Sequence, residues 1–599
     1  MKRLLPFLLL AFAVCATYAP AVRDGFVWDD TALILRDPLI RSPRLIVEGF
    51  QHFLFTDATA SNFYRPLQRL TYTLEYAAFG LRPALFHLTS IFCHAAAAIA
   101  LLLFAREFLR AFGATARRAD RIAFAAALIW AIHPIHSSAV VYISGRADPL
   151  AATFGFLGLY AALMRFRAID KKRGWVLASG CVLLFTMSAL SKESGLIFLA
   201  VYFLLVLALK KAQRLEAAGV IAIVLVTYLS LRLPAEHIEP PAPHALPFLV
   251  RPILAARALA EYAGLLVYPA NLRMERDVET HPSGFGEASI TGASIRELQT
   301  IAGLLVLAAF IYWALRERKR DRAAFIALAA GAVTFVPISG IIPLNATLAE
   351  HWLYLPSAFL FLSATMSAAR LLEGSRVPHL KHVAIPALAA WMVCLSGRSF
   401  VRTFDWKDQR TFLQRTIASG GESARMFINL ARLEIDEGQL DNAQPHLATA
   451  LAKEPDQPFA VICRAGLAIR QNDFVSAHKL LARATQMELV EARAHEMLAV
   501  LEFKETGHSN LLRMRLASRT GAGEWDIEKR YVKLLFESGA TEAALRELSR
   551  CLQTQWYRAD SWQLAAQLAA KSGHRDAAVA ALSQARTYDV RLSESGHVF

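Results

Sequence analysis

The chain has 599 residues, of which 55% are hydrophobic and 19% charged, and its mean hydropathy is +0.35. Soluble domains carry about 25% charged residues, so too few remain here to cover a water-soluble surface, and this hydrophobicity also excludes a disordered chain. Apolar stretches of about 18 residues or more predict an all-α fold with a polytopic membrane domain.

Eleven apolar stretches follow one another along the first two thirds of the chain. The sequence starts with Lys2-Arg3 before an apolar run, which predicts an anchor with its N-terminus inside, although the run also fits a cleaved signal peptide. We expect membrane spans at 4–20, 84–105, 122–137, 148–164, 174–190, 195–209, 215–231, 299–315, 323–343, 353–369 and 382–397.

Charge predicts which side each connection faces. If the N-terminus is inside, the inner connections hold 21 Lys and Arg against 6 Asp and Glu, and this difference equals the net charge of +15 of the whole chain. The positive-inside rule therefore accounts for the basic balance, and nucleic-acid binding is not expected. The inner connections are 106–121, 165–173, 210–214, 316–322 and 370–381.

Two outer segments are long, namely 21–83 and 232–298. The second contains an apolar stretch at 252–268 that Arg257 and Glu261 interrupt, so we expect it to lie along the membrane interface. With eleven spans and the N-terminus inside, we expect the C-terminal part to lie outside, in the periplasm if the cell is Gram-negative, and the protein to lie in the inner membrane.

From about residue 423 a 34-residue period replaces the apolar runs. Ala431, Ala443 and Ala450 recur 34 residues later, and a turn residue stands five positions before the recurring alanine of each unit, at Gly438, Asn472, Gly539 and Gly573. This pattern is typical of tetratricopeptide repeats, whose helical hairpins stack around a shared core. We predict a membrane domain at 1–398, a linker at 399–422 and a repeat domain at 423–599. We expect the repeats to present a groove to a peptide or protein, either an acceptor or an assembly partner. The alternative is that they serve only as a structural cap or oligomer contact.

Ionisable residues gather at the predicted outer ends of the spans, where charge is costly and therefore suggests function. Asp29 and Asp30 follow the first span as adjacent carboxylates, so one can face a reaction centre as a general base while the other holds the loop. The residues alone fit equally well a pair of Asp residues that caps the next helix.

Arg65, Arg146 and Lys192 lie in separate outer motifs and together predict a cationic pocket for a lipid phosphate arriving from the outer leaflet. Snorkelling to head groups is the alternative for each cation taken alone. The predicted donor-binding set is Tyr64, Arg65, His133, His136, Arg146, Asp148, Lys192, Glu193, Glu350 and His351.

Metal and nucleotide sites are not expected. His133 and His136 have H-x-x-H spacing, but no third ligand stands nearby, so histidines that hydrogen-bond at a helix end are favoured over a metal pair. Four of the six cysteines lie in apolar stretches, which excludes a disulfide framework. The sequence contains no phosphate-binding glycine loop and no G-x-S-x-G elbow. We predict no resident cofactor.

The motifs FVWDD, YRPL, AIHPIHSSAVVYISGRADPLAA, LSKESG and AEHWLYLPS precede the repeats in this order. In this the chain resembles the transmembrane and tetratricopeptide repeat-containing family of protein O-mannosyltransferases and their bacterial relatives, which have the C-type glycosyltransferase (GT-C) fold. The resemblance implies transfer of a sugar, with inversion, from a polyprenyl-phosphate carrier to a hydroxyl on the outer side. It implies that Asp29 or Asp30 is the base and that Arg65, Arg146 and Lys192 line the donor site.

Two motifs depart from the family pattern, because Ser137-Ser138 replaces a Thr-Glu pair and His351 replaces an arginine after Glu350. A histidine can still donate a hydrogen bond to a phosphate, but its charge depends on pH. The possibility that this protein uses a different donor sugar therefore stays open. Two alternative functions also stay open: the same fold acting on a lipid or polysaccharide, and a membrane-anchored repeat scaffold without enzymatic activity.

Overall fold

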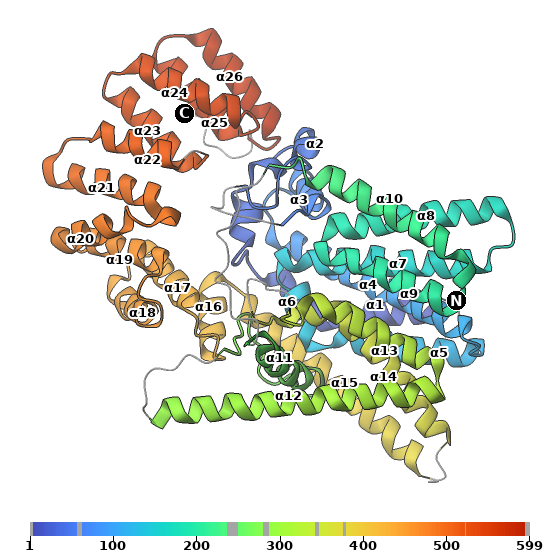
Figure 1. Cartoon of the computed structure of the whole chain (residues 1–599). Coiled ribbons are helices and arrows are strands. Elements are labelled where there is room, and N and C mark those ends of the chain that lie inside the picture. Colours follow the sequence, from blue (N-terminus) through green and yellow to red (C-terminus); the bar gives the residue numbers. More distant parts are fainter. Residues whose placement is uncertain are drawn as a thin grey trace.

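The computed structural model describes residues 4–56, 63–236, 250–279, 287–341, 347–374, 379–521 and 523–592. Within these ranges the chain is helical, with two isolated β-bridges and no strand. Figure 1 shows a bundle of long helices, coloured blue to yellow, and beside one end of it a curved stack of shorter helices, coloured orange to red. The predicted all-α fold is confirmed.

The bundle contains helices of very different length. Their bounds are α1 Leu5–Tyr18, α4 Pro83–Ala111, α5 Ala116–Ile132, α6 Ser137–Val140, α7 Ala147–Arg167, α8 Lys171–Ser191, α9 Ile197–Leu209, α10 Arg214–Arg232, α11 Val250–Val267, α12 Glu287–Arg320, α13 Arg322–Phe335, α14 Tyr354–Gly374 and α15 Leu380–Thr403. Two short helices, α2 Ile46–Gly49 and α3 Pro66–Phe79, belong to the first outer segment.

Each of the eleven predicted spans overlaps a helix of the bundle. Eight helices within the described ranges, taken with their flanking turns, are long and apolar enough to cross a membrane: α1, α4, α7, α8, α10, α12, α14 and α15. α5 with the turn after it makes a ninth if a bent pair counts as one span, and the helices around α9 and α13 are shorter. The chain is therefore a multi-pass membrane protein.

Two predicted spans are not straight helices of full length. The range 122–137 bends by 55° between α5 and the helical segment 134–140, because Pro134 has no N–H to donate and disfavours helical geometry at His133. The range 323–343 stops being α-helical at Phe335, just before Pro337, and its residues 342–343 lie outside the described part of the chain.

Ion pairs join the five basic connections at one end of the bundle. Because each pair links two different connections or the helix ends beside them, the connections share one side, as the charge pattern predicts. The pairs are Arg118–Glu373 at 3.1 Å, Arg165–Glu216 at 2.7 Å, Arg370–Asp321 at 3.2 Å and Arg167–Glu107.

α11 packs along α12 and is not among the helices that are long and apolar enough to span. Its interrupting charges face α12, since Arg257 Nε donates to Thr300 Oγ1 at 3.0 Å and Glu261 accepts from Gln299 at 2.6 Å. These bonds compensate two ionisable side chains that a lipid-facing surface would leave unpaired. The position of α11 along the interface stays a prediction.

Arg69 of α3 organises the first outer segment. Its guanidinium is buried, pairs with Asp37 at 3.0 Å and donates to four backbone carbonyls, those of Gly49, His52, Phe53 and Leu54, at 2.6 to 3.2 Å. One side chain thus replaces the regular hydrogen bonding that this irregular chain lacks. Asn62, two residues before the YRPL motif, lies outside the described residues.

The curved stack consists of antiparallel helical hairpins preceded by α16. Their bounds are α16 Gln409–Ala418, α17 Ala424–Asp436, α18 Leu440–Lys453, α19 Pro458–Arg470, α20 Phe474–Ala484, α21 Glu491–Thr506, α22 Leu511–Thr520, α23 Trp525–Glu537, α24 Thr541–Thr554, α25 Ala559–Lys571 and α26 Arg575–Tyr588. α16 falls inside the range 399–422 that the sequence predicts as a linker.

The four turn residues of the 34-residue period have positive φ: Gly438, Asn472, Gly539 and Gly573 lie between 60° and 83°. Glycine and asparagine adopt this left-handed backbone most easily, which explains why they recur at the turns. The recurring alanines Ala431, Ala443 and Ala450 and their equivalents at 465, 477 and 484 are fully buried.

Both ends of the stack contact the first outer segment. At the start, Gly25 donates to the Lys407 carbonyl at 2.8 Å. At the far end, Tyr76 donates to Asp589 at 2.7 Å and Ser42 donates to the Thr587 carbonyl at 3.0 Å. The repeat domain therefore forms an arch over one end of the bundle, and Figure 1 shows its last helices beside α2 and α3.

Replacing Asn472 tests the turn geometry. Asn472→Val is expected to lower the stability of the repeat domain by about 1–2 kcal/mol, because a β-branched residue disfavours φ near +60°. Asn472→Gly is expected to leave the stability of the repeat domain unchanged or to raise it. The apparent unfolding temperature in detergent is the measurement, with the exposed neighbour variant Gln471→Val as the control. Equal stability of the two valine variants would contradict the assignment.

Candidate functional site

Asp30 is fully buried and anchors the loop that follows α1. Its Oδ1 accepts from the Ser144 N–H at 2.9 Å and from the Ser144 hydroxyl at 2.5 Å, and its Oδ2 accepts from the Val27 N–H at 3.2 Å. Burial raises the pKa of Asp30 to about 7, against these bonds. With its oxygens engaged in this way, Asp30 holds the first outer segment to the start of α7.

Trp28 precedes the acidic pair with φ of 55°, which is unusual for a residue other than glycine. The chain after α15 maintains this conformation, because Gln409 accepts from the Trp28 N–H at 2.6 Å and Phe412 packs against the indole at 5.6 Å between ring centres. Such backbone strain costs about 1–3 kcal/mol and is typical of functional loops.

Asp29 is only partly buried, and it forms no ion pair within the described part of the chain. Its backbone N–H donates to the Tyr142 hydroxyl at 3.0 Å, and that hydroxyl in turn hydrogen-bonds to its carboxylate. Burial raises the pKa of Asp29 above its ordinary value, while Tyr142, Arg425 and Arg65 oppose the rise. Of the two predicted carboxylates, Asp29 is the less buried and the one with fewer hydrogen bonds among the described residues.

A second polar cluster lies near Asp29. Lys192 Nζ binds both carboxylate oxygens of Asp148 at 2.7 Å, and Arg65 Nε binds Glu193 at 2.9 Å, while Glu193 also accepts from the Tyr64 N–H at 2.7 Å. Arg65 acts electrostatically on Asp29, on Lys192 and on His351, so these groups from four separate motifs share one neighbourhood. The terminal nitrogens of Arg65 have no hydrogen-bond partner among the described residues, and its guanidinium lies over the Phe63 ring, 4.5 Å from the ring centre.

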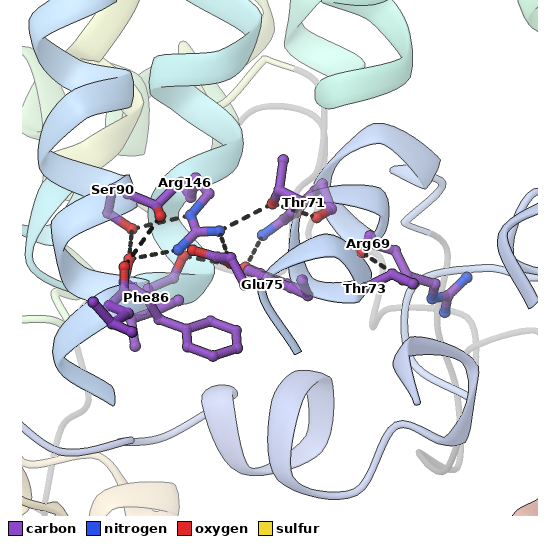
Figure 2. Close-up of polar contacts among 12 residues, drawn as sticks. Arg69, Thr71, Thr73, Glu75, Phe86, Ser90 and Arg146 are labelled. Atoms are coloured by element: carbon purple, nitrogen blue, oxygen red, sulfur yellow. Dashed lines mark hydrogen bonds and ion pairs between the residues drawn. The ribbon is translucent and has the colours of Figure 1, made fainter. Parts of the chain in front are cut away.

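The structure places Arg146 elsewhere, and this corrects its predicted role in binding the donor. Its guanidinium is fully buried and donates to Ser90 Oγ at 3.1 Å, to Thr71 Oγ1 at 3.0 Å and to the Phe86 carbonyl at 2.6 Å, and it pairs with Glu75. Figure 2 shows it enclosed by these groups. All of its nitrogens are satisfied internally, so Arg146 joins α3, α4 and α7 and does not face a ligand.

The two histidines of the H-x-x-H motif have different surroundings. His133 Nε2 contacts the Leu266 carbonyl at 3.1 Å and its Nδ1 accepts from the Ile135 N–H at 3.3 Å, as expected for a histidine at a helix end. His136 is fully buried beside Trp130 and Tyr354, with ring centres 5.0 and 4.8 Å away. Within the described ranges, no group of three or more His, Cys, Asp or Glu is arranged to hold a metal.

Glu350 belongs to a neighbouring site. It is buried, accepts from Arg276 at 3.1 Å and from the Arg273 N–H at 2.5 Å, and thereby fixes the segment after α11. A cavity of about 420 Å³ opens there. Its lining includes Glu261, Tyr268, Arg273, Arg276 and Gln299.

Sequence reasoning missed several residues around Asp29, namely Tyr142, Gln409 and Arg425. Tyr142 stands inside the quoted 131–152 motif, so that signal was present, and its ring stacks on Trp406 at 5.3 Å. Gln409 and Arg425 lie in the predicted linker and the first repeat, and no local pattern marks them. Only their contacts with Trp28 show that they belong to the site.

Comparison with known proteins supports the family resemblance. A tetratricopeptide repeat model matches residues 434–501. The chain is 24% identical to Protein O-mannosyl-transferase TMTC3 of Mus musculus over 75% of this chain and 51% of that protein, and 25% identical to TMTC4 of Mus musculus over 72% and 64%. TMTC2 of Homo sapiens is 34% identical over 31% of this chain and 22% of its own length.

The chain thus spans about half the length of the TMTC3 relatives that it matches. The resemblance predicted from the membrane motifs and the repeats is confirmed, since these relatives carry the name protein O-mannosyl-transferase and match across three quarters of this chain. The repeat match falls on α17 to α21, in the arch that contacts the Asp29 loop.

Replacing Arg146 tests its structural role. Arg146→Ala leaves Glu75 buried without its partner, so we expect a loss of about 3–5 kcal/mol in stability, seen as poor expression or a large fall in the apparent unfolding temperature. Arg65→Ala removes a partly exposed cation and is expected to change this temperature far less. Equal losses in both variants would contradict the distinction.

Proposed function

We propose that this protein is a membrane glycosyltransferase that moves a sugar from a polyprenyl-phosphate-linked donor to a hydroxyl of an extracytoplasmic acceptor, a Ser or Thr of a protein. The names of the relatives support protein O-glycosylation. The observation that carries the proposal is the partly buried carboxylate of Asp29, which forms no ion pair among the described residues. It is held in a strained loop beside a cluster of cations from separate outer motifs.

In the proposed reaction Asp29 takes the proton of the acceptor hydroxyl, and the oxygen of that hydroxyl attacks the anomeric carbon of the donor sugar. The bond between that carbon and the phosphate oxygen breaks, so the configuration inverts and the phosphate stays on the lipid. Tyr142 hydrogen-bonds to the Asp29 carboxylate and orients it. No resident cofactor takes part in this scheme.

The leaving phosphate needs positive charge that is in place before the reaction. Arg65 supports this role, since Glu193 holds its Nε and its two terminal nitrogens are left for a phosphate. Lys192 is paired with Asp148, which keeps the ammonium oriented, and His351 lies close to both. We propose that these three residues bind the donor, with Tyr64 and Glu193 shaping the site.

The proposed orientation follows from charge. The five basic connections and their ion pairs face the cytoplasm, and the Asp29 loop and the repeat arch face the periplasm at the inner membrane. A donor in the outer leaflet then reaches the cation cluster directly. The groove of the repeats is proposed to receive the protein acceptor or an assembly partner.

Asp29→Asn tests the base. The amide cannot accept a proton, so we expect transfer of hexose from polyprenyl-phosphate-hexose to a Ser/Thr peptide to fall at least about 100-fold, with an unchanged unfolding temperature. In the wild type the rate should decline as pH falls through the raised pKa of Asp29. Asp441→Asn, an exposed position in the repeats, is the control. Full activity of Asp29→Asn would refute the assignment.

Arg65→Gln tests donor binding. Losing a hydrogen-bonded charge is expected to raise the KM for the lipid-linked donor about 10-fold, with a smaller change in the KM for the peptide. Arg82→Gln, which alters an exposed arginine just before α4, is the matched control for charge. If Arg65→Gln changed only the peptide KM, the donor site would lie elsewhere.

A further inference from the structure

The first repeat helix reaches the Asp29 loop. Ser423 caps α17 and its hydroxyl contacts Glu275, in the segment that follows α11. Arg425, in the first turn of α17, pairs with the same carboxylate, with Nε 2.6 Å from Oε1. Its guanidinium also lies over the Trp28 indole, 5.2 Å from the ring centre. The repeat domain thus places a cation next to the residue that precedes Asp29.

The chain that leads into the repeats holds the same loop from a second side. The Lys407 carbonyl accepts from Gly25 at 2.8 Å, and Gln409 accepts from Trp28 at 2.6 Å. Phe412 packs on both Trp28 and Trp406, at 5.6 and 4.9 Å between ring centres. These contacts maintain the strained backbone at Trp28, so the loop geometry depends on the repeat domain and its entry segment.

Four groups act on the Asp29 carboxylate. Tyr142 hydrogen-bonds to it, Asp30 is its acidic neighbour, and positive charge comes from Arg65, just before α3, and from Arg425 on α17. Arg65 and Tyr142 belong to the membrane domain, whereas Arg425 belongs to the repeats. A shift of α17 therefore changes the surroundings of Asp29 without any change in the bundle.

We propose that Arg425 is a positioning residue through which the repeat domain sets the orientation and ionisation of Asp29. This inference rests on the proposed role of Asp29 as the base and adds that the membrane domain alone does not complete the reaction centre. Arg425 acts through Trp28 and through its charge, and Glu275 sets how much of that charge Asp29 experiences.

Two substitutions with opposite effects separate this role from a merely structural ion pair. Removing the cation in Arg425→Gln favours the protonated form of Asp29, so the pKa of Asp29 rises. Removing the anion in Glu275→Gln leaves Arg425 charged and unpaired, so the pKa of Asp29 falls. If the Arg425–Glu275 ion pair only joined the two domains, both substitutions would break it and would change the pKa of Asp29 in the same direction.

The experiment measures Asp29 directly, without an activity assay. The full-length protein in detergent is labelled with a carbodiimide and an amine across a pH range, and peptide mass spectrometry follows Asp29 relative to the exposed Asp441. We expect the labelling midpoint to move up by about 0.5–1 pH unit in Arg425→Gln and down in Glu275→Gln. It should stay near the wild-type value in Arg425→Lys and in Arg432→Gln, a matched exposed arginine on α17.

An unchanged midpoint in Arg425→Gln, or shifts of the same sign in Arg425→Gln and Glu275→Gln, would overturn the inference. If Arg425→Gln does not fold, the downward shift in Glu275→Gln still decides, because it requires a charged Arg425 near Asp29. The acid limb of the transfer rate should move with the labelling midpoint. Opposite labelling shifts together with full transfer by Asp29→Asn would refute the proposed base and leave the coupling intact.

Discussion

Burial of the Asp30 carboxylate is the interaction on which the outer face depends. A buried carboxylate needs hydrogen-bond donors, and here they come from its own loop and from the turn before α7, so Asp30 ties the loop after α1 to the bundle. Asp29 is adjacent in sequence and therefore takes its position from Asp30. The strained Trp28 completes this arrangement, and its partners lie far along the chain.

The arginines of the outer side divide by how completely the protein satisfies them. Arg69 and Arg146 are buried and bonded to carboxylates and carbonyls, so they hold helices and loops in shape and have nothing left for a ligand. Arg65 is only partly buried, and its terminal nitrogens have no hydrogen-bond partner among the described residues. Satisfaction of the nitrogens, more than the presence of the charge, distinguishes a structural arginine from one that can bind phosphate.

The repeat domain is attached to the first outer segment of the membrane domain at more than one place. The segment that enters the repeat domain contacts the first outer segment through Lys407 and Gln409, and the far end of the repeat domain does so through Thr587 and Asp589. Each repeat of an α-solenoid contacts mainly its neighbours, so the stacked hairpins connect the two ends of the arch.

Local sequence patterns were sufficient for most features that depend on a short stretch of chain, although not for the bend after α5 or for helix α16 in the predicted linker. Hydropathy predicted the helices of the bundle, the charge of the connections predicted which of them share a side, and the 34-residue period predicted turns at Gly438, Asn472, Gly539 and Gly573. The acidic pair and the cationic motifs were also visible, because ionisable groups near a membrane stand out against an apolar background.

Tertiary structure alone decided which of these groups act together. The sequence does not show that Arg146 is enclosed by Ser90, Thr71 and Glu75. It also does not show that hydrogen bonds occupy the oxygens of Asp30 more fully than those of Asp29, or that Arg425 lies over Trp28. These contacts join residues tens to hundreds of positions apart. Whether a charge is buried and paired or left available depends on the packing of several helices at once, which no local pattern encodes.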